Sequence, residues 1–209
     1  MEAFALESHA CALRAQAEGR FDRESVPLEG VTQDETPRAT TREKMASLEP
    51  LPGFPRLTAA VSSQTCDAAS AVLVVSAGTL KRHNLTPRAR IHHMSVMGDD
   101  PIMMLTAPIP ATKRAMARRG LSWSDIAIAE CNEAFASVPM AWLAETGFAH
   151  DRLNPNGGGI SLGHPIGATG TRIMTTMLHD LERTGGRYGL QTMCEGGGTA
   201  NVTIIERLG

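Results

Sequence analysis

The chain has 209 residues, of which 42% are hydrophobic and 20% charged, a composition that predicts a globular protein with a buried core and excludes disordered and fibrous classes. A net charge of −2 and a pI near 6.4 provide no basic field, so we expect no nucleic-acid partner. The apolar runs are far shorter than the ~20 residues of a membrane-spanning helix, and the first residues lack a signal-peptide pattern. We therefore expect no membrane span and a cytoplasmic location.

The first sixty residues carry the excess of acidic over basic side chains and predict one helix followed by a connector. Apolar side chains recur at intervals of three and four residues up to Gly19, which predicts a helix with one apolar stripe formed by Ala3, Leu6, Ala10, Leu13 and Ala17. Residues 26–56 are polar and contain five prolines, which favours an extended connecting loop.

From residue 70 onwards, short apolar runs alternate with helical periods, a pattern typical of layered α/β structure. We expect a buried strand at 71–75, a short helix at 78–83, a strand at 90–96, a helix at 111–119 and a strand at 126–130. A helix bent by Pro139 should follow at 133–146, and a second should begin at Pro165 and end at Gly185. The last two strands, 188–193 and 200–205, should form a hairpin.

The glycines gather near the end of the chain, where twelve of the twenty fall between Gly157 and Gly198. Glycine permits close approach of the backbone to another group, so we expect a site in this region. Three segments lie at strand ends or helix starts, where α/β proteins place their sites, and their sequences are CNEAFA at 131–136, NPNGGGISLGHPIGATG at 154–170 and CEGGG at 194–198.

Each segment admits a structural reading and a functional one. The glycines at 163, 167 and 170 loosely imitate a phosphate loop, but neither G-x-G-x-x-G spacing nor a Walker lysine is present. His164 alone could cap a helix, and Cys194 alone could be a buried inert thiol. The three glycines after Cys194 can turn backbone N–H groups inward, which would favour a thiolate or hold an oxyanion. With Asn132 at a third segment, the set predicts a thiol-chemistry site.

Metal and disulfide chemistry are not expected. The four cysteines stand tens of residues apart, at positions 11, 66, 131 and 194, and form no C-x-x-C pair. The adjacent His92 and His93 would point to opposite faces of a strand and would not share an ion.

Taken together and in this order, the three segments resemble those of the thiolases, and specifically the carboxyl-terminal half of one. The resemblance continues upstream through Ser62-Ser63-Gln64 with Asp67 and through residues 34–48, although Val61 and Ala68 depart from the family pattern. It implies an α/β fold with a layered αβα carboxyl-terminal domain at 88–209. It also implies the last strand and helix of the amino-terminal domain at 61–87, and a loop-domain remnant with its connector at 1–60.

The same resemblance implies an acyl-CoA C-acyltransferase that acts on 3-ketoacyl-CoA and coenzyme A, with coenzyme A as a substrate and no bound cofactor or metal. His164 would activate the family's nucleophilic cysteine, Cys194 would be the acid and base, and Asn132 would position a water. The N–H of Gly196 would hold an oxyanion. Ser63 and Phe135 would line the pantetheine path, while Glu133 would support its neighbours. The ending MCEGGGTANVTIIERL resembles thiolases of bacterial lipid or sterol side-chain breakdown.

The family's nucleophilic cysteine belongs to the amino-terminal half, and neither Cys11 nor Cys66 has its surroundings. Three alternatives follow: an incomplete chain, a chain that pairs with a separate amino-terminal half, or a non-catalytic thiolase-like binding or assembly subunit. A ketosynthase is disfavoured because that relative normally has a histidine where Cys194 stands. Without its neighbours, the strand expected at 71–75 would expose edges and apolar surface, which favours a homo-oligomer or another partner.

Overall fold

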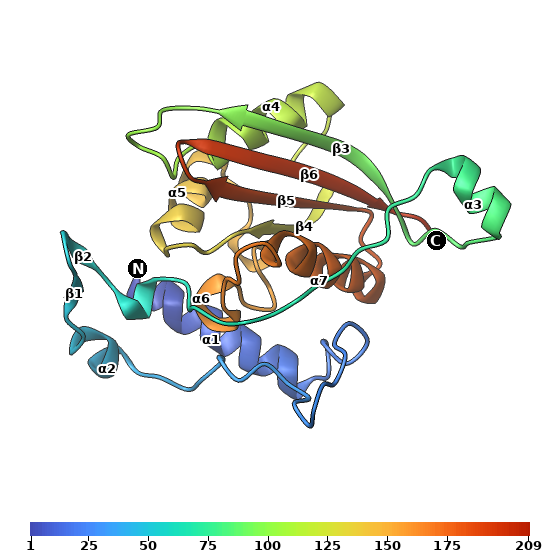
Figure 1. The fold of residues 1–209 in the computed structure, drawn as a ribbon. Coiled ribbons are helices and arrows are strands. Elements are labelled where there is room, and N and C mark those ends of the chain that lie inside the picture. Colours follow the sequence, from blue (N-terminus) through green and yellow to red (C-terminus); the bar gives the residue numbers. More distant parts are fainter.

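A four-stranded mixed sheet forms the centre of the computed structural model, which describes residues 1–209. Its strands lie in the order β3-β6-β5-β4 (Figure 1). β6 pairs antiparallel with both β3 and β5, whereas β4 runs parallel to β5. The bounds are β3 Ala89–Gly98, β4 Ile126–Cys131, β5 Tyr188–Glu195 and β6 Thr199–Arg207. The strands expected at 90–96, 126–130, 188–193 and 200–205 and the final hairpin are therefore confirmed.

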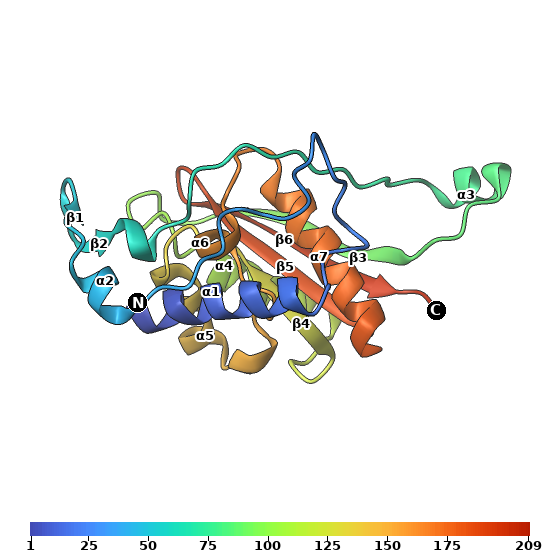
Figure 2. The same cartoon turned by 90° about the horizontal axis from the view of Figure 1, so that it is seen from below.

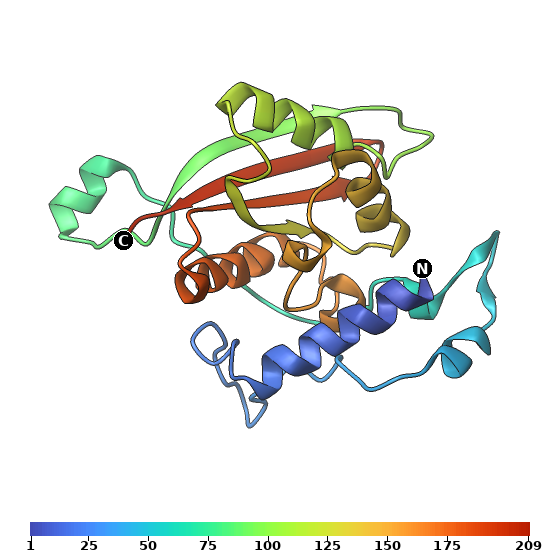
Figure 3. The same cartoon turned by 180° about the vertical axis from the view of Figure 1, so that it is seen from behind.

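Helices cover both faces of this sheet and produce the expected αβα layers. α4 (Pro108–Arg119) and α5 (Ser137–Thr146) lie on one face, and α7 (Thr169–Thr184) lies on the other (Figure 3). Each of the three helices ends at a glycine in the left-handed conformation, which halts the helix without a Cβ clash. The helix predicted to end at 119 does end there, before Gly120, and the predicted end at Gly185 is also confirmed.

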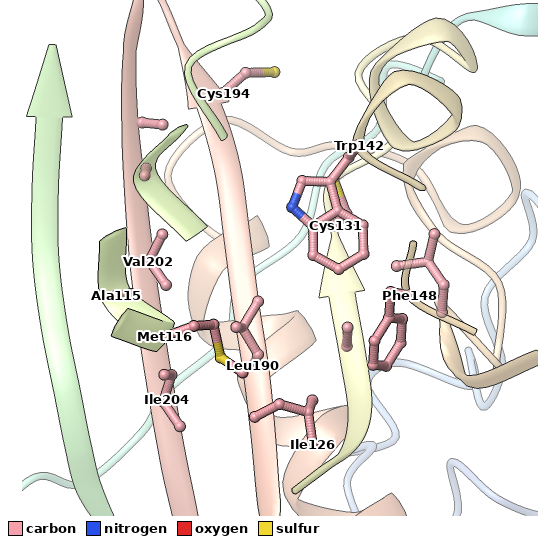
Figure 4. Close-up of a cluster of buried hydrophobic side chains, with 14 of the residues drawn as sticks. Ala115, Met116, Ile126, Cys131, Trp142, Phe148, Leu190, Cys194, Val202 and Ile204 are labelled. Carbon is pink, nitrogen blue, oxygen red and sulfur yellow. The ribbon is translucent and has the colours of Figure 1, made fainter. Parts of the chain in front are cut away.

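The largest apolar cluster lies between the sheet and the α4–α5 layer (Figure 4). Trp142 is fully buried there, with its ring 5.6 Å from Phe148 and 5.9 Å from Trp123 in edge-on contacts. Its indole N–H donates to Thr112 Oγ1 at 3.0 Å, so the buried polar atom is satisfied. This packing holds the ends of β4 and β5 against a rigid layer.

The amino-terminal helix α1 (Glu2–Ala17) packs against the short helix α6 (Gly159–Leu162), beyond the β4 edge of the sheet (Figure 1). The predicted helix is confirmed, but the predicted apolar stripe is wrong. The residues that α1 buries are small or polar, namely Ala5, Ser8, His9, Ala12 and Ala15. Small side chains permit a close approach, and the buried polar ones are hydrogen-bonded: Ser8 to Glu133, and His9 Nδ1 as acceptor from Arg38 N.

The strand expected at 71–75 is not formed, which corrects the sequence interpretation. The segment is extended but unpaired, and the side chains of Leu73 and Val74 are 80% and 67% exposed. The physical reason is that no other strand of these 209 residues lies beside it to supply hydrogen bonds. Residues 62–76 instead run outside the layers as far as α3 (Ala77–His83), the short helix expected at 78–83 (Figure 2).

Two helices begin later than predicted. α5 begins at Ser137, so Pro139 falls in the first turn, where its missing N–H breaks no helical bond and bends nothing. α7 begins at Thr169, and the preceding Ile166 is 97% exposed in the loop.

The connector at 26–56 also contains short elements: α2 Arg42–Ala46, β1 Pro50–Leu51 and β2 Phe54–Thr58, which continues to residue 58. None of the helices combines the length and apolarity needed to span a bilayer.

A row of buried polar side chains crosses the sheet on the α7 side. Glu130, Gln191 and Thr203 pair in register on β4, β5 and β6, and each is at most 8% exposed. Glu130 Oε1 and Gln191 Oε1 have no hydrogen-bond partner, and neither does Asp180 Oδ2 on α7. Burial, reinforced by the nearby carboxylate of Asp180, raises the pKa of Glu130 well above 4.5.

Glu130→Gln should make the protein less sensitive to rising pH. The folded state holds the Glu130 proton more tightly than the unfolded state, so this group destabilises the fold progressively as the pH rises above 4.5. The glutamine side chain does not ionise, so the variant should not lose stability in this way. At pH 8 its free energy of unfolding should exceed that of the unmodified protein by about 1 kcal/mol or more. Urea unfolding at pH 5, 6.5 and 8 measures this. Glu145→Gln, on the exposed face of α5, is the control, and parallel pH profiles for all three proteins would contradict the prediction.

Candidate active site

Asn132 and His164, 32 residues apart in sequence, are in contact at the end of the sheet. Asn132 immediately follows β4, and its backbone N donates to Thr192 O of β5 at 3.0 Å. Its side-chain Nδ2 donates to His164 Nε2 at 3.4 Å. Asn132 is 3% exposed and His164 is half-buried, so the pair lies at the boundary between core and surface. The expected convergence of the first two segments is therefore present in the fold.

The imidazole of His164 is held in one orientation and one tautomer. Its backbone N donates to Gln64 O at 2.9 Å, and its Nδ1 lies 2.6 Å from Thr169 Oγ1. The Thr169 hydroxyl donates its own proton to Pro165 O at 3.0 Å, so it accepts the Nδ1 proton of His164. Nε2 is then the unprotonated nitrogen, whose lone pair accepts from Asn132 Nδ2. Burial lowers the pKa of His164, which keeps the ring neutral and basic at neutral pH.

Cys194 lies at the same end of the sheet, on the neighbouring strand. β4 and β5 are parallel, with Cys131 opposite Thr192, so Cys194 stands two residues beyond that pair (Figure 4). It is 8% exposed, and burial raises the pKa of its thiol. This corrects the expectation that the following glycines favour a thiolate. A thiol that keeps its proton is suited to donating one.

The glycine turn after Cys194 joins β5 to β6 and rests on the loop that follows β3. Gly198 has a φ of +79°, and a Cβ there would lie 2.6 Å from Asp100 O, so only glycine fits. Its carbonyl oxygen accepts from Asp99 N at 2.8 Å. Gly196, at the start of the turn, is exposed, and its N–H points to no acceptor within the chain. The turn therefore holds a free backbone donor two residues from the thiol.

Ser63 and Phe135 are brought side by side, as expected for residues of one binding path. Ser63 N donates to Ala134 O at 3.0 Å, and Ser62 forms a β-bridge with Phe135. The same strip continues to Gln64, whose backbone N donates to Gly159 O at 3.2 Å and whose Nε2 donates to Ile160 O at 2.8 Å. Residues 61–64 therefore join the Asn132 segment to the His164 segment.

The other cysteines are not placed as activated nucleophiles. Cys66 packs against the His164 segment so closely that a Cβ on Gly163 would approach its Sγ to 2.3 Å, yet no hydrogen bond joins the thiol to the imidazole. Burial raises the pKa of Cys66, as it does for Cys11 and Cys131. No group of three or more histidine, cysteine, aspartate or glutamate side chains is arranged to hold a metal ion.

Sequence reasoning missed two residues that set the geometry of His164. Thr169 stands five residues after the histidine, inside the helix predicted to begin at Pro165, and nothing in that pattern marks its contact with the imidazole. Gln64 entered the sequence analysis only as part of the Ser62-Ser63-Gln64 segment that resembles the thiolases. Its bridging contacts depend on tertiary folding and leave no periodic trace in the sequence.

Two family models match consecutive parts of the chain. The one described as "Thiolase, C-terminal domain" matches residues 85–207, and "Thiolase, N-terminal domain" matches residues 1–78. The chain belongs to the thiolase family. A steroid 3-ketoacyl-CoA thiolase of Mycobacterium tuberculosis is 56% identical over 100% of this chain and 52% of its own length.

Solved thiolases share the fold as well. The acetyl-CoA acetyltransferase of Bacillus anthracis superposes with a TM-score of 0.92 at 36% identity, covering 99% of this chain and 55% of that one. Human mitochondrial 3-ketoacyl-CoA thiolase in complex with CoA superposes with a TM-score of 0.92 at 34% identity, covering 100% and 54%. The chain thus spans about half the length of the thiolases it matches, and the expected thiolase-like fold is confirmed.

Thr169→Val should release the imidazole of His164 from its tautomer. Valine has nearly the same shape but cannot accept the Nδ1 proton, so a half-buried N–H loses its partner, at a cost of about 1–2 kcal/mol in the free energy of unfolding. Imidazole ¹⁵N shifts should report a mixture of tautomers in the variant and a single Nδ1–H form in the unmodified chain. Thr169→Ser keeps the hydroxyl and should restore both values. Equal behaviour of the valine and serine variants would refute the assignment.

Proposed function

We propose that this chain forms the carboxyl-terminal half of the active site of a 3-ketoacyl-CoA thiolase. The reaction is acyl transfer between 3-ketoacyl-CoA and coenzyme A in lipid or steroid side-chain breakdown. The observation that carries the proposal is the contact between Asn132 and His164 beside the strand end that bears Cys194, in a chain of the thiolase family. The steroid 3-ketoacyl-CoA thiolase among its relatives supports the substrate class. The cytoplasmic location stays a prediction.

His164 and Cys194 divide the proton transfers between them. The neutral Nε2 of His164 takes the proton of the nucleophilic cysteine, whose thiolate attacks the 3-keto carbon. Cleavage of the bond between C2 and C3 leaves the acyl group on that cysteine and releases the acetyl-CoA carbanion. The Cys194 thiol, which burial keeps protonated, gives its proton to this carbanion. The Cys194 thiolate then takes the thiol proton of coenzyme A, whose sulfur attacks the thioester. The acyl group leaves as a shortened acyl-CoA, and the nucleophilic cysteine takes back its proton from His164.

Two groups of donors would hold the negative charge that develops in these steps. The free N–H of Gly196 is proposed to bind the oxyanion of the tetrahedral intermediate, a role worth ~3 kcal/mol for one fixed donor. Asn132 is proposed to position a water that, with His164, stabilises the enolate oxygen of acetyl-CoA. Ser63 and Phe135, which lie side by side, would line the pantetheine path.

The nucleophilic cysteine is proposed to lie on polypeptide outside these 209 residues. Burial raises the pKa of all four thiols of this chain, so none has the depressed pKa of an acyl acceptor. The alternative function, a non-catalytic binding or assembly subunit, follows from the same observation. Turnover of an assembled protein separates the two.

Complementation tests the proposal directly. This chain, mixed with the amino-terminal half of a related thiolase that carries the nucleophile, should cleave a steroid side-chain 3-ketoacyl-CoA in a coenzyme A-dependent reaction, measured by loss of substrate and appearance of acetyl-CoA. His164→Ala should lower kcat by about 10²–10⁴-fold, because it removes the base. Cys11→Ser, at a half-buried position of α1, should leave kcat unchanged. A stable complex without turnover would support the binding subunit instead, and faster cleavage of straight-chain substrates would overturn the substrate class.

The isolated chain should self-associate. Apolar side chains are exposed on the unpaired segment 71–75 and on the edge strand β3, including Leu73, Val74, Met94 and Val96. Light scattering across a range of protein concentrations should report species larger than a monomer, and the complementary half should reduce them. Leu73→Ser with Val74→Ser should weaken self-association, and a monomer that remains unchanged at high concentration would contradict the expectation.

A further inference from the structure

We propose that Glu133 is a positioning residue that, together with Asn154, clamps Asn132 beside His164 and ties this pair to α1 through Ser8. The proposal rests on the function proposed above and names which buried contacts fix its asparagine. According to this proposal, α1 helps to fix the positions of Asn132 and His164 although α1 does not line the site.

The Glu133 carboxylate accepts hydrogen bonds from three donors on two segments that are distant from it in sequence. Ser8 Oγ on α1 donates to Oε2 at 2.7 Å, and Ile160 N of α6 donates to the same oxygen at 3.1 Å. Asn154 Nδ2 donates to Oε1 at 2.9 Å. The side chain is 1% exposed and no cation pairs with it, so these donors alone replace its hydration.

The site asparagine is held on both sides by this network. On one side, Asn154 Oδ1 accepts from Cys131 N and Asn154 Nδ2 donates to Cys131 O, both at 2.9 Å. On the other side, Glu133 is fixed by its own three donors. Asn132, between them, has little freedom to move its backbone, and its Nδ2 is directed at His164. Asn154 adopts a left-handed φ of +45°, a conformation that asparagine tolerates better than most residues.

The Glu133 carboxylate is also packed tightly against the backbone of Gly158. A Cβ on Gly158 would fall within 2.3 Å of the Glu133 carboxyl carbon, so the glycine backbone lies directly against it. Ser8 Oγ also lies 2.9 Å from Ser161 Oγ and accepts from Gly158 N at 3.3 Å. The loop that leads to His164 is therefore fastened to Glu133 and Ser8 together. Movement of α1 would be transmitted to the Asn132–His164 pair through this loop.

Glu133→Gln tests the clamp with almost no change in shape. Two donors point at Oε2 and one at Oε1, so the NH₂ group should replace Oε1, where it faces Asn154 Nδ2 and that contact is lost. The remaining amide oxygen is uncharged and a weaker acceptor than a carboxylate oxygen, so backbone hydrogen exchange at Ile160 should become about tenfold faster. The imidazole ¹⁵N shift of His164 Nε2 should move toward that of a nitrogen without a donor. In the complemented enzyme, kcat should fall by about 10–100-fold while KM for the acyl-CoA stays unchanged.

Two further variants keep the test decisive. Ser8→Ala removes only the α1 connection and should give a smaller change of the same sign in all three measurements, which covers the case in which Glu133→Gln fails to fold. Glu7→Gln, next to it on the exposed face of α1, should change none. Unmodified exchange at Ile160 and an unmodified His164 Nε2 shift in both the Glu133 and Ser8 variants would overturn the proposal. If the unmodified chain shows no turnover, the proposed function fails, while exchange and ¹⁵N shifts still decide whether the clamp exists.

Discussion

Parallel pairing of β4 with β5 is the constraint on which the rest of the site depends. Parallel strands end at the same edge of a sheet, so residues more than sixty positions apart become neighbours there. The backbone bond from Asn132 N to Thr192 O extends that pairing one step beyond β4. The aromatic cluster around Trp142 packs on one face of this edge, and α7 covers the other. The site therefore inherits its rigidity from the core rather than from its own loops.

Burial decides the protonation states at this edge. It lowers the pKa of His164 and raises that of Cys194, so both groups are uncharged at neutral pH. A neutral imidazole accepts a proton and a neutral thiol donates one, which is the division of roles proposed above for carbon–carbon cleavage. Glu133 differs in its hydrogen bonding: burial raises the pKa of its carboxyl, and hydrogen bonds from Ser8, Asn154 and Ile160 oppose that rise. Its role is structural, next to the residues proposed to change protonation.

The layered architecture and the three site segments could be predicted from the sequence, but the faces on which the helices pack could not. Apolar runs of five or six residues located β4, β5 and β6, and the glycine stops located the ends of α4 and α7. The buried face of α1 was misjudged because its core contacts are made by serine, histidine and alanine, which periodicity of large apolar residues cannot detect. The segment 71–75 has the composition of a strand, and composition cannot reveal that no neighbour is present to pair with it.

Within the site, local motifs identified Asn132, His164 and Cys194, and tertiary contacts supplied the rest. Thr169, Gln64 and Asn154 act through hydrogen bonds to residues that only folding brings into contact with them, and so they have no spacing signature. The direction of the Cys194 pKa was misjudged for a related reason. Neighbouring glycines are visible in the sequence, whereas the extent to which a thiol is shielded from solvent depends on every element that packs around it.

The contact between the glycine turn (196–198) and the loop after β3 affects how members of this fold can diverge. Because Gly198 meets the backbone of Asp100 without room for a Cβ, the height of the turn is set by the length of that loop. An insertion of one residue near Asp100 would lift the Gly196 donor away from the thiol while leaving both residues unaltered. Variation in loop length at this point would thus retune the chemistry without any substitution among the residues that perform it.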